Sequence, residues 1–387
     1  MKKALFISSR NLYPLIGGEK IRTAQALRYL SQIYEVDVIC ESDEKNYDLG
    51  PLAKCIHNYY HFYIPKIRHY IWTLRFLFNK HPLQVNYYYS KDIQKLIDKI
   101  IDKYDIVFCN NIRTTKYLLK HHNVVRYVDF VDSIAMNYQR AKKSSTGLKK
   151  IIFTIDAKRC TNYERFLYQL FDRCSVISEI DRSYILKGNE SGEIDIIYNS
   201  VTLPTHKDVS EKPYTISFIG KMSYEPNIVA VINFVKNIFP LVLQKYPNTK
   251  FYIVCSNPTK EILSLQRDNI YVTGFVEEVE PYMQQSSIVI APMLTGAGIQ
   301  NKILQAMALK CCVVTTTIGA EGLHIKNDEI LISDGNQNIA NDIIELLGDK
   351  NKRILMGVKA FDYIVQNFSK EKIFDSFYKS IKLSIKK

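Results

Sequence analysis

Two stretches of the sequence combine glycine with lysine in a way that suits the binding of a phosphate group. In the first stretch, a short apolar run ends at Gly220 and Lys221 follows at once. Glycine allows a ligand to approach the backbone closely, and a lysine ammonium supplies a point charge for a phosphate. A Gly-Lys pair after a strand is more often an ordinary turn, so this stretch alone is weak evidence for a binding site.

The second stretch covers residues 287–310 and carries a stronger signal for an anion. An apolar run leads into a loop with Gly296 and Gly298, and the pattern after the loop predicts a helix that begins near Asn301. A helix N-terminus offers unpaired N–H groups and a partial positive charge, which suit a diphosphate. Lys302 in the first turn is unfavourable for the helix dipole unless an anion binds there. An ordinary loop with a surface lysine is the alternative.

The motifs exclude several other classes of protein. Neither loop matches G-x-x-x-x-G-K-[ST], which excludes a P-loop ATPase, and no clean G-x-G-x-x-G follows the first apolar run, which argues against a nicotinamide-dependent dehydrogenase. The eight cysteines have neither C-x-x-C nor zinc-site spacing, so we expect reduced thiols in the cytosol and no metal site. Because no run of about 18 apolar residues occurs, no membrane-spanning helix is expected. The apolar N-terminus is interpreted as a strand rather than a secretion signal.

The two loops must be held by the strands and helices around them. In the sequence, short apolar runs alternate with helical patterns. Such alternation predicts parallel sheets that are covered by helices on both faces. In the first half we predict strands at 2–8, 35–40, 105–110, 124–131 and 174–180. In the second half, after the polar segment 204–214, we predict strands at 215–220, 250–256, 269–275, 287–293, 311–317 and 329–334, with helices at 227–246, 278–285, 301–309 and 337–348.

The chain of 387 residues is long enough for two domains. We predict an α/β protein with two tandem Rossmann-like domains that face a central cleft, where ligands bind in such folds. The predicted boundaries are 1–206 for the N-terminal domain and 207–367 for the C-terminal domain. Residues 368–387 are predicted to form a basic amphipathic helix that could pack back on the N-terminal domain.

Several segments of the second half, taken in this order and spacing, resemble the nucleotide-sugar domain of retaining glycosyltransferases of family 4, which have the GT-B fold. The segments that carry the resemblance are 218–227, 271–293, 296–309, 311–323 and 331–334. The first half matches more loosely, at 17–31, 126–133, 175–181 and 198–201. The similarity is to members of the family that build bacterial surface polysaccharides.

The resemblance implies transfer of a sugar from a nucleotide diphosphate sugar to a glycan or a polyprenyl-linked oligosaccharide, with retention of configuration. No metal and no other cofactor is implied. Lys221 and Lys302 would neutralise the departing diphosphate. The residues expected around the donor are Gly220, Gly296, Gly298, Ile299, Gln300, Asn301, Gln305 and Glu321. On the N-terminal side, the residues expected at the acceptor cleft are Gly17, Gly18 and Arg22.

The chain departs from the family pattern at the paired glutamates, which stand eight positions apart in many relatives. Here these positions hold Ala297 and Gln305. The amide of Gln305 can still bond ribose hydroxyls, whereas Ala297 cannot bond a donor sugar. The Lys-Gly pair that relatives usually carry after the first strand of the C-terminal domain is also missing. Pro226-Asn227 lies near that position. A second hypothesis therefore stays open, namely a non-catalytic nucleotide-sugar or glycan-binding partner with the same fold.

Two aspartates replace the histidine that many relatives carry beside the reacting carbon. Asp129 and Asp132 lie in the run DFVD, and either could orient a sugar hydroxyl or stabilise positive charge at the anomeric carbon. We prefer Asp132, because it lies nearer the end of the predicted strand. A strand-end aspartate is otherwise commonly a helix cap.

Basic residues are concentrated in one window, because residues 51–150 hold 18 Lys and Arg against six Asp and Glu. Within this window, residues 57–91 mix basic side chains with seven tyrosines and the only tryptophan. This mixture suits the edge of an anionic bilayer, a tyrosine-rich helix packed inside the domain, or single-stranded nucleic acid. No nucleic-acid module is evident, so no nucleic acid is expected as a partner. We expect a cytoplasmic protein with peripheral contact at the inner face of the membrane, through Lys66, Arg68, Arg75 and Lys80.

Overall fold

The computed structural model describes residues 2–15, 18–189, 192–203, 209–295, 299–323, 325 and 328–385. Contacts between residues divide the chain into two compact units. The N-terminal unit comprises residues 1–199 and 373–387, and the C-terminal unit comprises residues 200–372. The boundary predicted after residue 206 falls outside the described residues, and the contacts place the division after Asn199.

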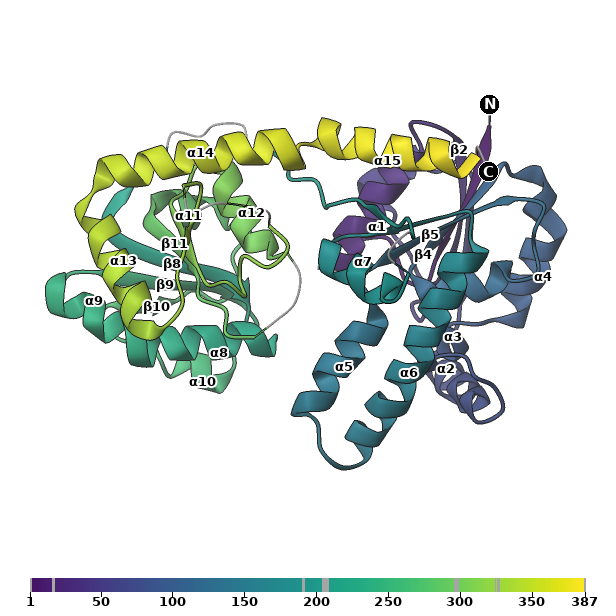
Figure 1. The fold of residues 1–387 in the computed structure, drawn as a ribbon, viewed down its shortest axis with the longest axis horizontal. Coiled ribbons are helices and arrows are strands. Elements are labelled where there is room, and N and C mark those ends of the chain that lie inside the picture. Colours follow the sequence, from purple (N-terminus) through teal and green to yellow (C-terminus); the bar gives the residue numbers. More distant parts are fainter. Residues whose placement is uncertain are drawn as a thin grey trace. The chain divides into compact units, whose positions relative to one another are not determined.

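A parallel sheet of seven strands forms the centre of the N-terminal unit (Figure 1). Its strand order is β3-β2-β1-β4-β5-β6-β7, so the order reverses between β1 and β4. The strands are β1 (Lys3–Ser8), β2 (Glu35–Ser42), β3 (Tyr59–Tyr63), β4 (Ile106–Asn110), β5 (Val125–Val131), β6 (Arg173–Val176) and β7 (Asp195–Ile196).

The central strands of this sheet are buried on both faces, which explains why they are continuous apolar runs in the sequence. Along β1, Leu5 and Ile7 belong to one core cluster, whereas Ala4 and Phe6 belong to a second cluster on the opposite face. The helices of this unit before residue 199 are α1 (Gly18–Leu30), α2 (Lys66–Thr73), α3 (Leu83–Tyr87), α4 (Lys91–Ile100), α5 (Ile134–Ser144), α6 (Gly147–Leu170) and α7 (Glu179–Leu186). Short 3₁₀ helices cover Gly50–Cys55, Leu74–Leu77, Ile101–Lys103 and Ile112–Leu118.

Two parts of this unit differ from the sequence-based expectation. The strand predicted at 174–180 ends at Val176, because the side chain of Ser178 caps α7 by accepting a hydrogen bond from the Asp181 N–H at 3.1 Å. Helices α5 and α6, which lie side by side as a long hairpin (Figure 1), were not predicted.

Helix α15 (Lys370–Ile385) completes the N-terminal unit from the far end of the chain. Its residues Ile373, Phe377 and Ile381 belong to the core cluster on one face of the seven-stranded sheet. The hydroxyl groups of Ser380 and Tyr127 are hydrogen-bonded at 2.7 Å.

The C-terminal unit contains a parallel sheet of six strands in the order β10-β9-β8-β11-β12-β13. Its strands are β8 (Lys212–Lys221), β9 (Lys250–Ser256), β10 (Ile270–Val272), β11 (Ser286–Ala291), β12 (Val313–Thr315) and β13 (Leu331–Ile332). Its helices are α8 (Glu225–Asn233), a π-helical turn (Phe234–Ile238), α9 (Phe239–Lys245), α10 (Lys260–Leu263), α11 (Glu280–Gln285), α12 (Asn301–Ala308), α13 (Asn336–Gly348) and α14 (Lys350–Phe368). Both sheets have the strand order of a Rossmann fold, so the predicted pair of Rossmann-like α/β domains is confirmed.

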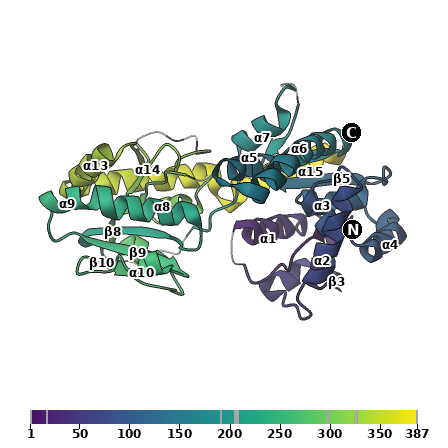
Figure 2. The ribbon, with the colours of Figure 1, turned by 90° about the horizontal axis from the view of Figure 1, so that it is seen from below.

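The continuous helical stretch Glu225–Lys245 is the one stretch in the described part of the chain that is long and apolar enough to cross a membrane by length and composition. In the structure, Val231, Phe234 and Ile238 of this stretch belong to the core of the C-terminal unit. The stretch lies along β8 (Figure 2), and the ring centroid of Phe234 is 4.7 Å from that of Phe251. We therefore interpret it as a core helix of this unit.

Candidate functional site

The predicted phosphate-binding lysines lie at the carboxyl edge of the C-terminal sheet. The strand order reverses between β8 and β11, which is where parallel α/β sheets bind ligands. Lys221 ends β8 and its side chain is exposed, while Lys302 lies in the first turn of α12, which follows β11. Asn227 joins the two positions, because its Nδ2 donates to the Lys221 carbonyl at 3.0 Å and its Oδ1 accepts from Lys302 Nζ at 2.5 Å.

The ammonium group of Lys302 lies in an unusual environment for a positive charge. Its Nζ lies 4.4 Å from the centroid of the Phe218 ring and 3.7 Å from Met293 Sδ. Burial lowers the pKa of Lys302 from 10.5 to about 7. Among the described residues no carboxylate forms an ion pair with this lysine. A phosphate oxygen would therefore supply the counter-ion that the protein itself does not.

Gly220 has a packing role in this arrangement. A Cβ atom at this position would lie 2.6 Å from Asn227 Nδ2 and 3.2 Å from Cε1 of Phe218. Both of these side chains contact Lys302, so a larger residue at position 220 would push them out of place. The expected approach of a ligand to the Gly220 backbone stays a prediction.

Gln305 is bound to an acidic residue that the sequence did not point to. Its Nε2 donates to Glu280 Oε1 at 2.7 Å, and Glu280 lies in the first turn of α11. The pair offers a carboxylate and an amide oxygen as acceptors for hydroxyl groups. The sequence led us to expect this role of the Gln305 amide alone.

The other predicted donor residues surround the start of α12. Asn301 begins the helix and Gln300 precedes it. Ile299 lies against Gly322, where a Cβ atom would be 3.1 Å from Ile299 Cγ1, and Glu321 precedes that glycine in the turn after β12. Gly296 and Gly298 lie outside the described residues, as does Ala297.

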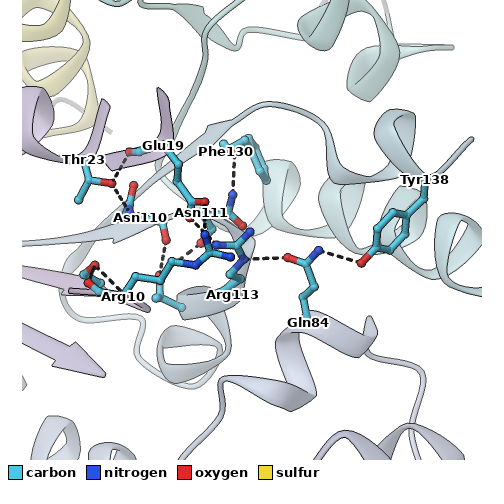
Figure 3. A network of polar contacts seen from close by, with 11 residues as sticks. Arg10, Glu19, Thr23, Gln84, Asn110, Asn111, Arg113, Phe130 and Tyr138 are labelled. Atoms are coloured by element: carbon cyan, nitrogen blue, oxygen red, sulfur yellow. Dashed lines mark hydrogen bonds and ion pairs between the residues drawn. The ribbon is translucent and has the colours of Figure 1, made fainter. Parts of the chain in front are cut away.

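The N-terminal unit has its own cluster of polar residues, at the carboxyl ends of β1, β4 and β5 (Figure 3). The Glu19 carboxylate joins two arginines, since Oε2 accepts from Arg10 Nη1 at 2.8 Å and Oε1 accepts from Arg113 Nη1. Arg113 Nε also donates to Gln84 Oε1 at 2.7 Å, and Gln84 Nε2 donates to the Tyr138 hydroxyl at 2.8 Å. This network holds two guanidinium groups and several hydroxyl-binding groups at the sheet edge.

Asp132 lies at the same edge, directly after β5. A tight turn places it there, because the Asp132 N–H donates to the Phe130 carbonyl at 2.9 Å and Val131 between them has φ 67°. This backbone conformation is strained for a β-branched residue. Burial, and secondarily the charge of Asp181, raises the pKa of Asp132 to about 6, and Asn137 Nδ2 donates to its Oδ2 at 2.8 Å. Asp132 could therefore accept a proton or a hydrogen bond near neutral pH.

The structure does not support the expected roles of Asp129 and Arg22. Arg22 Nε donates to Asp129 Oδ2 at 2.8 Å, its Nη2 donates to Oδ1 at 3.1 Å, and both side chains are at most 2% exposed. Ser175 Oγ donates to the same carboxylate at 2.9 Å. Because these partners satisfy both charges inside the core, we assign the pair a structural role. Gly18 begins α1, and Gly17 lies outside the described residues.

We also searched the described part of the chain for side chains that could hold a metal ion. There, no group of three or more His, Cys, Asp and Glu side chains is arranged to hold a metal ion. Cations that could serve an anionic ligand are instead supplied by Lys221 and Lys302 in one unit and by Arg10 and Arg113 in the other.

Sequence reasoning missed several residues of these clusters. Arg10 follows β1, and Arg113 lies three positions after the end of β4, so a search for polar residues near the carboxyl ends of predicted strands would have found them. Glu19, Gln84 and Glu280 carry no comparable signal, because their roles depend on partners far away in the sequence.

Comparison with known proteins shows which proteins this chain resembles. Residues 213–349 match the family model described as glycosyl transferases group 1. This range contains Lys221, Asn227, Glu280, Lys302 and Gln305. Together with the two Rossmann-like units, the match supports a glycosyltransferase of the GT-B class.

Particular proteins resemble the chain over nearly its whole length. An uncharacterized 44.6 kDa protein in the cps region of Klebsiella pneumoniae is 25% identical, and the match covers 98% of this chain and 100% of that protein. A mutant of S. aureus TarM in complex with fondaparinux, α-GlcNAc-glycerol and UDP has a TM-score of 0.69 at 14% identity and covers 99% of this chain and 100% of its own. WaaG, a glycosyltransferase involved in lipopolysaccharide biosynthesis, has a TM-score of 0.65 at 12% identity, with 97% and 99% covered.

Proposed function

We propose that the protein transfers a sugar from a nucleotide diphosphate sugar to a glycan or a lipid-linked oligosaccharide, with retention of configuration, in the synthesis of a bacterial surface polysaccharide. The buried ammonium of Lys302, which has no carboxylate partner among the described residues, carries this proposal. The S. aureus TarM mutant binds UDP, and the relative from Klebsiella is encoded in a cps region, so a UDP-sugar is the first donor to test. We expect the reaction in the cytoplasm, without a metal or another cofactor.

Lys302 supports the proposal through the charge that develops on the leaving group. When the bond between the sugar and the diphosphate breaks, negative charge grows on the phosphate oxygens. A buried cation stabilises this charge more strongly than it stabilises the bound donor, and such preorganised groups typically contribute about 3–4 kcal/mol. Lys221 is exposed at the end of the neighbouring strand and would add a second positive charge.

Glu280 and Gln305 support recognition of the nucleotide. In the proposed complex, the Glu280 carboxylate accepts hydrogen bonds from the ribose hydroxyls, and the 2.7 Å bond from Gln305 holds it in place. A carboxylate on α11 would then take the role of the glutamate that position 305 lacks. Glu280→Gln should weaken donor binding at least tenfold, because the amide accepts fewer and weaker hydrogen bonds.

Release of the nucleotide tests the proposal directly. Purified protein is incubated with UDP-, GDP-, ADP- and dTDP-sugars, with and without glycan and polyprenyl-linked acceptors, and free nucleotide is measured. We expect release with one donor, enhanced by an acceptor, and its loss in Lys302→Met. Anomeric configuration of the product, read by NMR, tests retention.

The second hypothesis, a non-catalytic nucleotide-sugar or glycan-binding partner, is favoured by Ala297 and Gln305 in place of the paired glutamates. It predicts a thermal shift with a nucleotide sugar, as expected of any ligand that binds the folded state, but no nucleotide release with any acceptor.

A further inference from the structure

Helix α2 carries an apolar stripe on the outside of the molecule. Its residues Ile67, Tyr70 and Ile71, with Leu74 after the helix, follow the i, i+3, i+4, i+7 spacing that normally faces a core. These four side chains are 55–65% exposed, whereas His69 on the opposite side of the helix is buried. The Tyr70 ring makes an edge contact with the Tyr87 ring, with centroids 5.8 Å apart, and the stripe as a whole stays exposed to solvent.

The exposed apolar surface continues beyond the helix. In the 3₁₀ turn and directly after it, Leu77 is 64% and Phe78 is 90% exposed. A phenylalanine ring held almost entirely in water is unfavourable, because the burial of apolar surface is favourable in proportion to its area. A run of six such side chains indicates an interaction surface rather than scattered exposure.

Helix α6 lies beside this segment and adds further apolar side chains. Arg159 Nη1 donates to the Phe76 carbonyl at 3.0 Å, and Asp156 Oδ1 accepts from the Leu83 N–H at 2.9 Å, so the two segments are joined. These two bonds join α6 to the 3₁₀ turn that follows α2 and to the first residue of α3. We use the name α2–α6 surface for the exposed apolar residues Ile67, Tyr70, Ile71, Leu74, Leu77, Phe78, Ile151, Ile152 and Ile155.

The charge of both segments points to the partner. Residues 49–91 and residues 133–155 contain no Asp or Glu at all, although both contain several Lys and Arg. The basic side chains exposed on these segments include Lys66, Arg68, Lys80, Lys149 and Lys150. Lys66 Nζ lies 2.9 Å from Asp43 Oδ2, so its charge is partly compensated within the protein, and Arg68, Lys80, Lys149 and Lys150 carry most of the argument. A surface that is apolar at its centre and predominantly basic around it is complementary to an anionic bilayer, where lysines contact headgroups and apolar side chains enter the acyl boundary.

We propose that the α2–α6 surface docks the protein on an anionic lipid bilayer. Exposed apolar side chains enter the interface between headgroups and acyl chains, and the surrounding lysines and Arg68 bind lipid phosphates. Arg75 does not take part, since its Nη1 donates to the Tyr89 carbonyl at 2.8 Å and its guanidinium stacks on Trp72 at 5.1 Å. Because Arg75 is engaged within the protein, we leave it out of the proposed surface.

Binding to vesicles tests this proposal without any sugar donor, so its outcome is independent of the proposed function. The full chain is mixed with vesicles of phosphatidylcholine alone or with about one third phosphatidylglycerol, and the bound fraction is measured by flotation. Trp72, the only tryptophan, lies in α2 and reports contact by quenching with brominated lipids.

Two variants and one control separate the contributions. Leu77→Ser with Phe78→Ser should reduce the partition coefficient at least tenfold at any salt concentration. Lys66→Gln with Arg68→Gln and Lys80→Gln should reduce it about a hundredfold at low salt, since each of the three charges contributes roughly fivefold. Phe275→Ser removes a 77% exposed apolar side chain from the C-terminal unit and should leave binding unchanged.

The opposite results are equally clear. Equal binding of wild type to neutral and anionic vesicles, or unchanged binding of both variants, would overturn the proposal. A wild-type dimer in solution that Leu77→Ser with Phe78→Ser converts to a monomer, without vesicle binding, would instead make the surface an interface between copies. Because all substituted side chains are exposed, unfolding curves should match and confirm that the variants fold.

Discussion

Replacing Lys302 with methionine should make the protein inactive and, at neutral pH, slightly more stable. The methionine side chain is unbranched and of similar length, so contacts with Phe218 and Met293 are kept. Burial lowers the pKa of Lys302 from 10.5 to about 7, so the folded protein holds the charged form at a cost. At 1.36 kcal/mol per pKa unit, the cost is about 4 kcal/mol at pH 7 and about 2 kcal/mol at pH 9.

The variant also loses favourable contacts. The Asn227 Oδ1 atom is left without its donor, which costs about 1–3 kcal/mol, and the cation–π contact with Phe218 is worth about 0.5–2 kcal/mol. The lost contacts together amount to about 3 kcal/mol. Because the unfolded chain binds more protons than the folded one between pH 7 and 10.5, the stability of wild type rises with pH in this range. Methionine should therefore stabilise the fold by about 1 kcal/mol at pH 7. At pH 9 Lys302 is neutral and the cation–π contact is absent, so the cost and the lost hydrogen bond are both about 2 kcal/mol and the variant should match wild type.

Urea unfolding at pH 7 and pH 9 measures the change in stability of Lys302→Met. Nucleotide release measures its activity, for which we expect turnover to fall by a factor of about 10²–10³. Lys310→Met is the matched control, since Lys310 follows the same helix and contacts Phe361 at 4.8 Å from an exposed position. The control should keep its activity. A Lys302→Met protein that is much less stable at pH 7, or one that turns over like wild type, would refute the reasoning.

Three further predictions follow from the same contacts. Affinity for a UDP-sugar, measured by calorimetry, should fall as pH rises from 7 to 9, because Lys302 must be protonated to bind the diphosphate; affinity that does not change with pH would contradict the assignment. Arg22→Met should destabilise the fold by about 3–5 kcal/mol in urea unfolding, because it leaves the buried Asp129 carboxylate without its cation, and adding Asp129→Asn should recover part of this loss. Nucleotide release should survive EDTA; loss that Mg²⁺ or Mn²⁺ restores would make Asp132 a suspected metal ligand.

Much of the fold could be predicted because both sheets are buried on both faces. Central strands such as β1 and β11 are therefore continuous apolar runs between helical patterns, and their positions were predicted to within one or two residues. Helix α6 was not predicted, because apolar side chains also lie on its exposed face. Its outward-facing Ile151, Ile152 and Ile155 blur the helical period that a one-sided core would have imposed.

The candidate site could be predicted only where local pattern determines function. Lys302 was found because a lysine in the first turn of a helix conflicts with the helix dipole. Asp129 looked equally suitable, and only the structure shows that Arg22, 107 positions earlier in the chain, neutralises it. The bond between Gln305 and Glu280 is likewise a long-range contact, and no spacing rule connects residues on two separate helices.

The place of α15 in the N-terminal unit has a consequence for how the protein is made. Ile373, Phe377 and Ile381 fill the core beside β1 and β4, yet the ribosome reaches Ile373 only after the entire C-terminal unit. At roughly 5–20 residues per second, completion of the N-terminal core lags its own first 199 residues by about ten seconds or more. During that interval the apolar surface that α15 later covers is exposed, and a premature stop codon in the last helix would damage the half of the protein that was synthesised first.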